Sequence, residues 1–223
     1  MPAPPEAAPD LEALDASEVI AHAVERHHPR LALACSFQKE ESVLLDLLLT
    51  IKPDARVFAL DTAVLFPETY DVWREVESRY NIKVESFSGP TLAAQAAEHG
   101  DRLWERDPAA CCGLRKLEPL GRALAGLDGW ITGLRREQSP TRATAAKAEW
   151  DATHSLWKYN PLADWTERDV WRHIHERGLP YNPLHDRGYA SIGCTHCTSP
   201  GTGREGRWAG TEKTECGLHP AAS

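Results

Sequence analysis

Short apolar runs alternate with helix-forming segments along most of this chain. The runs that read as strands are 31–35, 56–60, 82–87, 129–132 and 156–161. Segments with helical spacing of apolar residues are 15–28, 43–51, 67–80, 91–99 and 166–177. Strands that alternate with helices at this spacing form βαβ units, which connect parallel neighbours. The pattern therefore predicts one α/β domain with a parallel, twisted sheet and helices on both faces.

Polar loops follow three of the predicted strands, at 36–42, at Asp61-Thr62 and at 133–139. Open parallel sheets bind ligands beyond the carboxyl ends of their strands. The first loop also precedes a helix, whose free N–H groups favour an anion such as phosphate. It has neither the G-x-x-x-x-G-K-[ST] pattern of P-loops nor the S-G-G-x-D pattern of ATP pyrophosphatases. A phosphate-binding loop and an ordinary strand-to-helix loop both remain open.

The chain has 25 Lys and Arg against 33 Asp and Glu, a net charge of −8 over 223 residues. An acidic chain of this kind is poorly suited to binding the backbone of DNA or RNA, so no nucleic acid partner is expected. Basic residues nevertheless form clusters, at Arg115-Lys116, at Arg135-Arg136 with Arg142 and Lys147, and at Arg204 and Arg207. These clusters suggest a small anionic ligand.

Composition divides the chain into three parts. Residues 1–14 are rich in Pro and Ala and lack the features of a signal peptide, so we expect a disordered leader. Residues 15–200 are long enough for a single domain, and residues 201–223 are expected to form a flexible tail. The longest apolar run, 43–51, contains Asp46 and is too short to cross a membrane. We expect a cytoplasmic protein with no membrane partner.

Six cysteines in a reducing compartment indicate metal binding or catalysis before disulfides. Cys111 and Cys112 are adjacent, whereas Cys194 and Cys197 form a C-x-x-C pair. Adjacent cysteines point apart, and they serve more easily on different corners of a cluster than on one zinc ion. The spacing favours a [4Fe–4S] cluster, with zinc or merely buried thiols as alternatives.

Cys216 lies in a polar, Gly-containing segment near the C-terminus, where a cysteine has no core to fill. We interpret it as a nucleophile on a flexible arm, because cationic neighbours can lower the pKa of such a thiol. Arg204 and Arg207, three residues apart, could bind an oxyanion together or could form a solvated turn. Cys35, within a predicted strand, is expected to be a small buried residue.

Taken together, these motifs resemble the iron–sulfur branch of the adenylylsulfate (APS) and phosphoadenylylsulfate (PAPS) reductase family. The resemblance runs from about Leu31 to His219. The segments that carry it are 60–62, 65–70, 111–116, 133–139, 160–166, 193–197 and 215–219, the last reading Glu-Cys-Gly-Leu-His.

The resemblance implies a Rossmann-like sheet of the adenine-nucleotide α-hydrolase type that binds APS. Cys216 would attack the sulfur of APS, releasing AMP and leaving an S-sulfocysteine. Thioredoxin or a similar dithiol would then release sulfite. The implied cofactor is a [4Fe–4S] cluster held by Cys111, Cys112, Cys194 and Cys197.

The same resemblance assigns three groups of site residues. The phosphosulfate end is assigned to Lys116, Arg204 and Arg207, and His219 is a further candidate catalytic residue. The loop beside the nucleotide phosphate is assigned to Ser36, Gln38 and Lys39. The adenosine end is assigned to Leu60, Gly133 and Arg135, and Asp61 and Thr62 are further candidate substrate-binding residues. Related loops often carry Gly, small residues and then Glu-Asp where this chain has Gln38-Lys39-Glu40-Glu41.

Two other functions remain open. A PAPS reductase would use the same terminal cysteine, although it normally lacks the cluster cysteines. A non-catalytic zinc or iron–sulfur module that binds nucleotides would leave the Glu-Cys-Gly-Leu-His segment unexplained. The sequence does not decide whether the chain forms a homo-oligomer.

Overall fold

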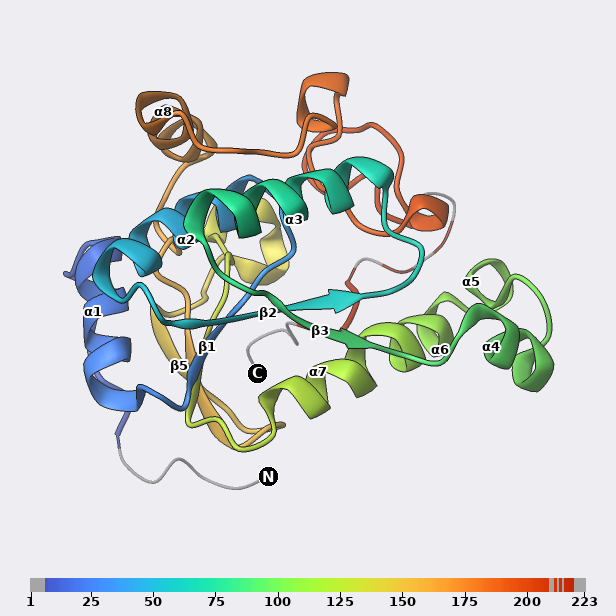
Figure 1. Ribbon diagram of the computed structural model, residues 1–223, viewed down its shortest axis with the longest axis horizontal. Coiled ribbons are helices and arrows are strands. Elements are labelled where there is room, and N and C mark those ends of the chain that lie inside the picture. Colours follow the sequence, from blue (N-terminus) through green and yellow to red (C-terminus); the bar gives the residue numbers. More distant parts are fainter. Residues whose placement is uncertain (1–6, 209–210, 212, 214, 219–223) are drawn as a thin grey trace.

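A six-stranded sheet with the strand order β3-β2-β1-β4-β6-β5 forms the centre of the computed structural model (Figure 1). The structure describes residues 7–208, 211, 213 and 215–218. The strands are β1 (Leu31–Ala34), β2 (Arg56–Asp61), β3 (Glu85–Ser88), β4 (Gly129–Ile131), β5 (Ala148–Asp151) and β6 (Leu156–Tyr159). The α-helices are α1 (Ala16–His27), α2 (Lys39–Ile51), α3 (Pro67–Tyr80), α4 (Leu92–His99), α5 (Leu103–Arg106), α6 (Pro108–Cys112), α7 (Glu118–Leu124) and α8 (Glu167–Arg177).

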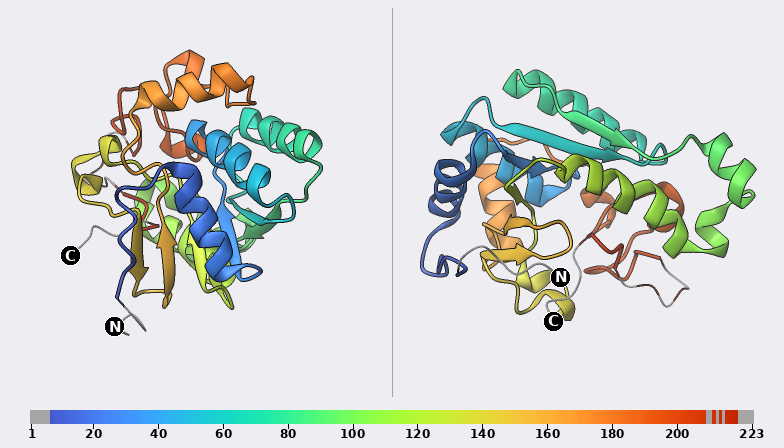
Figure 2. Two further views of the ribbon diagram at one scale, coloured as in Figure 1. Left: turned by 90° about the vertical axis from the view of Figure 1, so that its left-hand side faces the viewer. Right: turned by 90° about the horizontal axis from the view of Figure 1, so that it is seen from below.

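Helices cover both faces of the sheet, as Figures 1 and 2 show, because side chains alternate between the faces along each strand. Leu31 and Leu33 of β1 join the larger core, which packs beneath α1, α2, α3 and α8. Ala32, between them, points into a smaller core that α7 covers with Leu120 and Leu124. Helices α4, α5 and α6 extend beyond one end of the sheet.

Strands β1, β2, β3, β4 and β6 run parallel, which confirms the predicted α/β sheet. The edge strand β5 is antiparallel to β6 and was not predicted. Only Ala148 of its four residues is buried, so no apolar run marks it in the sequence. Strand β1 pairs with β2 on one side and with β4 on the other. This change of direction creates a crevice at the carboxyl ends of β1 and β4, where such sheets bind ligands.

Helix α2 begins at Lys39, earlier than the Val43 predicted from apolar spacing. The Glu41 carboxylate accepts a hydrogen bond from the Gln38 backbone N–H at 3.3 Å, which caps the first turn. The polar residues assigned to a loop are thus partly helical. The free N–H groups of α2 consequently lie nearer to β1 than the sequence suggested.

Helix α6 continues directly into a π-helical turn, η1 (Gly113–Leu117). Short 3₁₀ turns cover Arg136–Gln138, Pro140–Arg142, His185–Arg187 and Thr195–Cys197. A π-turn offsets the residues that follow it, and such turns often lie at functional sites. Arg115 and Lys116 are in this turn and are both buried.

The N-terminal segment makes packed contacts before residue 15, where the domain was expected to begin. Leu11 is buried in the larger core, and Glu12 forms an ion pair with Arg136. Leu11 and Glu12, which lie in the segment predicted to be a leader, therefore contact the folded domain through one apolar side chain and one carboxylate. Residues 1–6 lie outside the described part of the chain. In the described ranges, no helix is long and apolar enough to cross a membrane.

Candidate active site

A cavity of about 200 Å³ lies at the carboxyl ends of the central strands. Residues after Gly178, a segment that is orange to red in Figure 1, also line it, among them Ile192, Arg204 and Arg207. The site residues named from the sequence that line it are Ser36, Gln38, Lys39, Leu60, Thr62, Lys116, Gly133, Arg135, Arg204, Arg207 and Cys216. The fold thus brings together loops that are far apart in the sequence.

Gly133 follows β4 and presses against the first turn of α2. A Cβ atom at Gly133 would lie 2.3 Å from Glu41 Oε1 and 2.9 Å from Glu40 Cβ, so only glycine fits there. The Ser36 hydroxyl donates a 2.6 Å hydrogen bond to Glu41 Oε2. Burial and the neighbouring Glu40 raise the pKa of Glu41 to about 7. The Glu41 carboxyl group therefore connects the loop at Ser36 to the first turn of α2.

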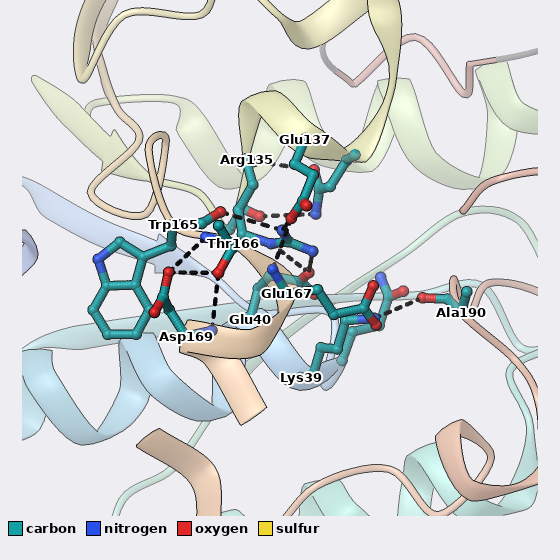
Figure 3. A network of polar contacts seen from close by, with 12 residues as sticks. Lys39, Glu40, Arg135, Glu137, Trp165, Thr166, Glu167, Asp169 and Ala190 are labelled. Atoms are coloured by element: carbon teal, nitrogen blue, oxygen red, sulfur yellow. Dashed lines mark hydrogen bonds and ion pairs between the residues drawn. The ribbon is translucent and has the colours of Figure 1, made fainter. Parts of the chain in front are cut away.

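Lys39 and Arg135 are held by carboxylates in the wall of the cavity (Figure 3). Arg135 donates from Nε to Glu40 at 3.0 Å and from Nη1 to Glu137 at 2.9 Å. Lys39 Nζ forms a 2.8 Å ion pair with Glu167. Both cations line the cavity, as expected, but these carboxylates already balance their charges. Lys39 and Arg135 therefore shape this wall of the cavity more than they add positive charge to it.

Asp61 does not line the cavity, in contrast to the role assigned to it from the sequence. Its carboxylate accepts hydrogen bonds from the Tyr70 hydroxyl at 2.7 Å and the Ala63 backbone N–H at 2.8 Å. Burial and the Asp61 carboxylate raise the pKa of Tyr70. Asp61 therefore stabilises the turn after β2. The neighbouring Thr62 lines the cavity and is buried.

Two buried cations, Arg207 and Lys116, also line the cavity. The Arg207 Cζ atom lies 4.6 Å from the centre of the Trp208 ring, and Arg207 Nη1 donates a hydrogen bond to the Ser191 hydroxyl at 3.1 Å. The Arg207 guanidinium also lies close to Gly193, and a Cβ at that position would be only 2.3 Å from Arg207 Nη2. Lys116 is only 9% exposed and borders both the main cavity and a second, smaller one. These positions suit the binding of an anion.

Cys216 lines the main cavity and is 7% exposed. It packs with Cys112 and Trp208, so the tail brings its thiol to the boundary between the two cavities. Residues 209–210, 212, 214 and 219–223 lie outside the described part of the chain, and so does His219. The sequence marked Arg115 and Arg142 only as members of basic clusters, and Glu215 only as a neighbour of Cys216. Their individual contacts were not predicted, because no local pattern specifies them.

The other four candidate cysteines, Cys111, Cys112, Cys194 and Cys197, line the smaller cavity together. Among the described residues, no three Cys, His, Asp or Glu side chains converge closely enough for one metal ion. Four soft thiol side chains that line one cavity are a donor set that fits an iron–sulfur cluster or a zinc ion.

The surroundings of these thiols also fit an anionic cluster. Burial and the nearby thiols raise the pKa of Cys111 and of Cys197 to about 11, so these two side chains need nearby positive charge to be held as thiolates. Arg115 donates to the Thr62 carbonyl oxygen at 2.8 Å. Its Nε and Nη2 atoms are buried and find no hydrogen-bond partner among the described residues. Such unpartnered donors suit a negatively charged group bound beside them.

A family profile and known proteins match this chain over most of its length. The profile described as "Phosphoadenosine phosphosulfate reductase domain" matches residues 30–200. The chain belongs to this family. The Adenosine 5'-phosphosulfate reductase of Geobacillus kaustophilus is 48% identical over 218 residues, covering 95% of this chain and 93% of the relative. The Phosphoadenosine 5'-phosphosulfate reductase of Gloeobacter violaceus is 45% identical, covering 93% and 90%.

Solved structures agree with the family and the fold. The phosphoadenylyl-sulfate (PAPS) reductase of Candida auris, in a phosphate complex, superimposes with a TM-score of 0.76 at 32% identity, covering 85% of this chain and 92% of that one. Candida glabrata FMN adenylyltransferase superimposes with a TM-score of 0.61 at 15% identity, covering 84% and 63%, and shows the fold alone. The family resemblance and the adenine-nucleotide α-hydrolase-like fold predicted from the sequence are confirmed.

Proposed function

We propose that this chain reduces APS to sulfite and AMP, with Cys216 as the nucleophile. One observation carries the proposal: the Cys216 thiol, the cations Lys116, Arg204 and Arg207, and the nucleotide-binding edge of the sheet share one cavity. The relatives named Adenosine 5'-phosphosulfate reductase, such as that of Geobacillus kaustophilus, support the choice of substrate.

The residues of the cavity divide the work between its two walls. The turn at Gly133 and the loop at Ser36 hold the adenosine and its phosphate against the sheet. The Cys216 thiolate attacks the sulfur of APS, the S–O bond to the AMP phosphate breaks, and that oxygen keeps the electron pair. Lys116, Arg204 and Arg207 stabilise the charge that develops on this oxygen, in a site that excludes most water.

Release of sulfite needs a two-electron reductant, for which we propose thioredoxin or a similar dithiol. One thiolate of the dithiol attacks Cys216 Sγ of the S-sulfocysteine, and sulfite leaves with the electrons of the S–S bond. The second thiol then frees Cys216 and closes the disulfide of the reductant. Because Cys216 is buried, the segment that carries it must move outward before a protein can reach it.

A [4Fe–4S] cluster is the proposed cofactor, held by Cys111, Cys112, Cys194 and Cys197. The grouped thiols and the unpartnered Arg115 donors support it. When bound, the cluster would supply a fixed negative charge beside Lys116, which borders both cavities. Analysis of anaerobically purified protein should find iron and sulfide; zinc without sulfide would contradict the proposal.

A PAPS reductase is the second candidate, because the Gloeobacter violaceus relative bears that name. The cysteine quartet favours APS. Sulfite release from APS and PAPS, compared by kcat/KM, should give a clear preference for APS. With either nucleotide, Cys216→Ser should abolish sulfite release and leave the visible spectrum of the cluster unchanged. A Ser variant with normal turnover would refute the proposed nucleophile.

A further inference from the structure

Glu215, the residue before Cys216, binds two arginines that come from different parts of the chain. Its carboxylate accepts hydrogen bonds from Arg142 Nε at 3.1 Å and from Arg142 Nη2 at 3.0 Å. Arg204 Nη2 donates to Glu215 Oε2 at 2.8 Å. The Glu215 side chain is 18% exposed, and those of Arg142 and Arg204 are 8% and 15% exposed. Charge-assisted bonds shielded in this way are stronger than surface ion pairs.

The arginine pair, Arg142 and Arg204, needs an anion between its members. Burial and the nearby Arg142 lower the pKa of Arg204 to about 10, since two buried cations repel each other. Arg207 adds to that repulsion. A carboxylate bound to both members of the pair balances part of this charge. Glu215 supplies it from within the chain.

The other end of the same short segment has an apolar anchor. Leu218 packs against the smaller core beneath the sheet, beside residues such as Phe58 and Leu120. Gly217 has φ +89°, a left-handed conformation that allows the chain to turn between the two anchors. Cys216 lies between the ionic and the apolar anchor. Its position in the cavity is therefore fixed from both sides.

We propose that Glu215 is a positioning residue: by binding Arg142 and Arg204, it holds the Cys216 thiol in the cavity. This inference rests on the proposed function in taking Cys216 as the reacting thiol. The contact also sets how readily the segment leaves the cavity, because withdrawal of Cys216 toward a protein dithiol must first break the bonds of Glu215.

Alkylation of Cys216 by iodoacetamide, followed in the holoenzyme by peptide mass spectrometry, tests the contact. Each variant's rate is measured from pH 7 to pH 9, below the pKa of about 10 of Arg204, and its pH profile separates access to the thiol from ionisation of the thiol. Glu215→Gln should raise this rate about tenfold, because it weakens charge-assisted bonds to both arginines. Glu215→Asp should restore part of the protection. Glu205→Gln, at an exposed carboxylate of the same loop, is the matched control and should leave the rate unchanged.

A second variant separates this contact from a general loosening of the fold. Arg142→Gln should also raise the alkylation rate, and the Glu215→Gln, Arg142→Gln double variant should be no faster than the faster single variant. Turnover of APS should fall through kcat in Glu215→Gln, with KM changed less. Unchanged alkylation in both single variants, or fully additive effects, would overturn the inference. Sulfite release by Cys216→Ser would instead refute the nucleophile, while the alkylation rates still report on Glu215.

Discussion

The two walls of the cavity are stabilised in different ways. The sheet wall follows β1, β2 and β4, whose backbones are hydrogen-bonded in register and whose side chains enter the two cores. The loop wall, after Gly178, has two short 3₁₀ turns and isolated bridges such as that between Thr198 and Arg207. Side-chain contacts of Arg204, Arg207 and Glu215 hold it in place.

Because of this difference, we expect the sheet wall to serve mainly substrate binding and the loop wall to serve mainly the chemical step. A wall built on strand ends keeps its shape without a ligand, which suits recognition of a rigid adenosine. A wall held by a few ion pairs can open at low cost, which suits a thiol that must meet both a small substrate and a protein. Changes to the loop wall should therefore alter the rate of the chemical step, and changes to the sheet wall should alter substrate binding.

The largest effect on turnover is expected at Lys116, the buried cation that borders both cavities. Lys116→Ala should lower kcat/KM for APS by about 10²–10³, because a buried cation acts mainly on charge that develops in the transition state. Lys83→Ala is the control, since that side chain is 85% exposed and should have no effect on turnover. Steady-state sulfite release measures both. If alanine variants at Lys116, Arg204 and Arg207 each lost only a few-fold in kcat/KM, these cations would not stabilise the transition state.

A smaller effect is expected on the sheet wall at Gly133. Gly133→Ala places a Cβ 2.3 Å from Glu41 Oε1, so the turn or helix α2 must shift. The KM for APS should rise by about tenfold to a hundredfold, with less change in kcat. Gly121→Ala in α7 is the matched control, because a Cβ there meets nothing within 4 Å. Equal behaviour of the two variants would show that Gly133 does not shape the binding wall.

The smallest effect concerns the stability of the folded chain in acid, through His27 at the end of α1. Burial lowers the pKa of His27 to about 4, while its Nε2 atom lies 2.8 Å from the Tyr159 hydroxyl. Between pH 6.5 and pH 4 the unfolded chain binds a proton at this histidine that the folded chain does not, so stability falls as the pH falls. Glu41, whose pKa is raised to about 7, acts in the opposite direction over part of this range.

A comparison with His27→Gln isolates that contribution, since Gln does not titrate and can still bond to Tyr159. The thermal midpoint of the parent should drop more than that of the variant from pH 6.5 to pH 4. Parallel pH curves would mean that His27 does not contribute to acid sensitivity.

Patterns that are local in sequence predicted most of the fold. Apolar runs marked every parallel strand, and the cysteine spacing marked four residues that line one small cavity. Pairings between distant residues could not be read in this way. Glu215 and Arg142 are separated by 73 positions, and nothing near either residue specifies the other. Asp61 lies at a strand end, but a local turn and Tyr70 direct its carboxylate away from the cavity.

The proposed mechanism depends most directly on which thiol reacts with APS. Protein mixed with APS in the absence of any dithiol should carry one SO₃ adduct, and peptide mass spectrometry should place it on Cys216. Cys35 also borders the cavity, but burial and the Glu41 carboxylate raise the pKa of its thiol well above the ordinary value. An adduct on the Cys35 peptide, or none on the Cys216 peptide while sulfite is released, would contradict the account.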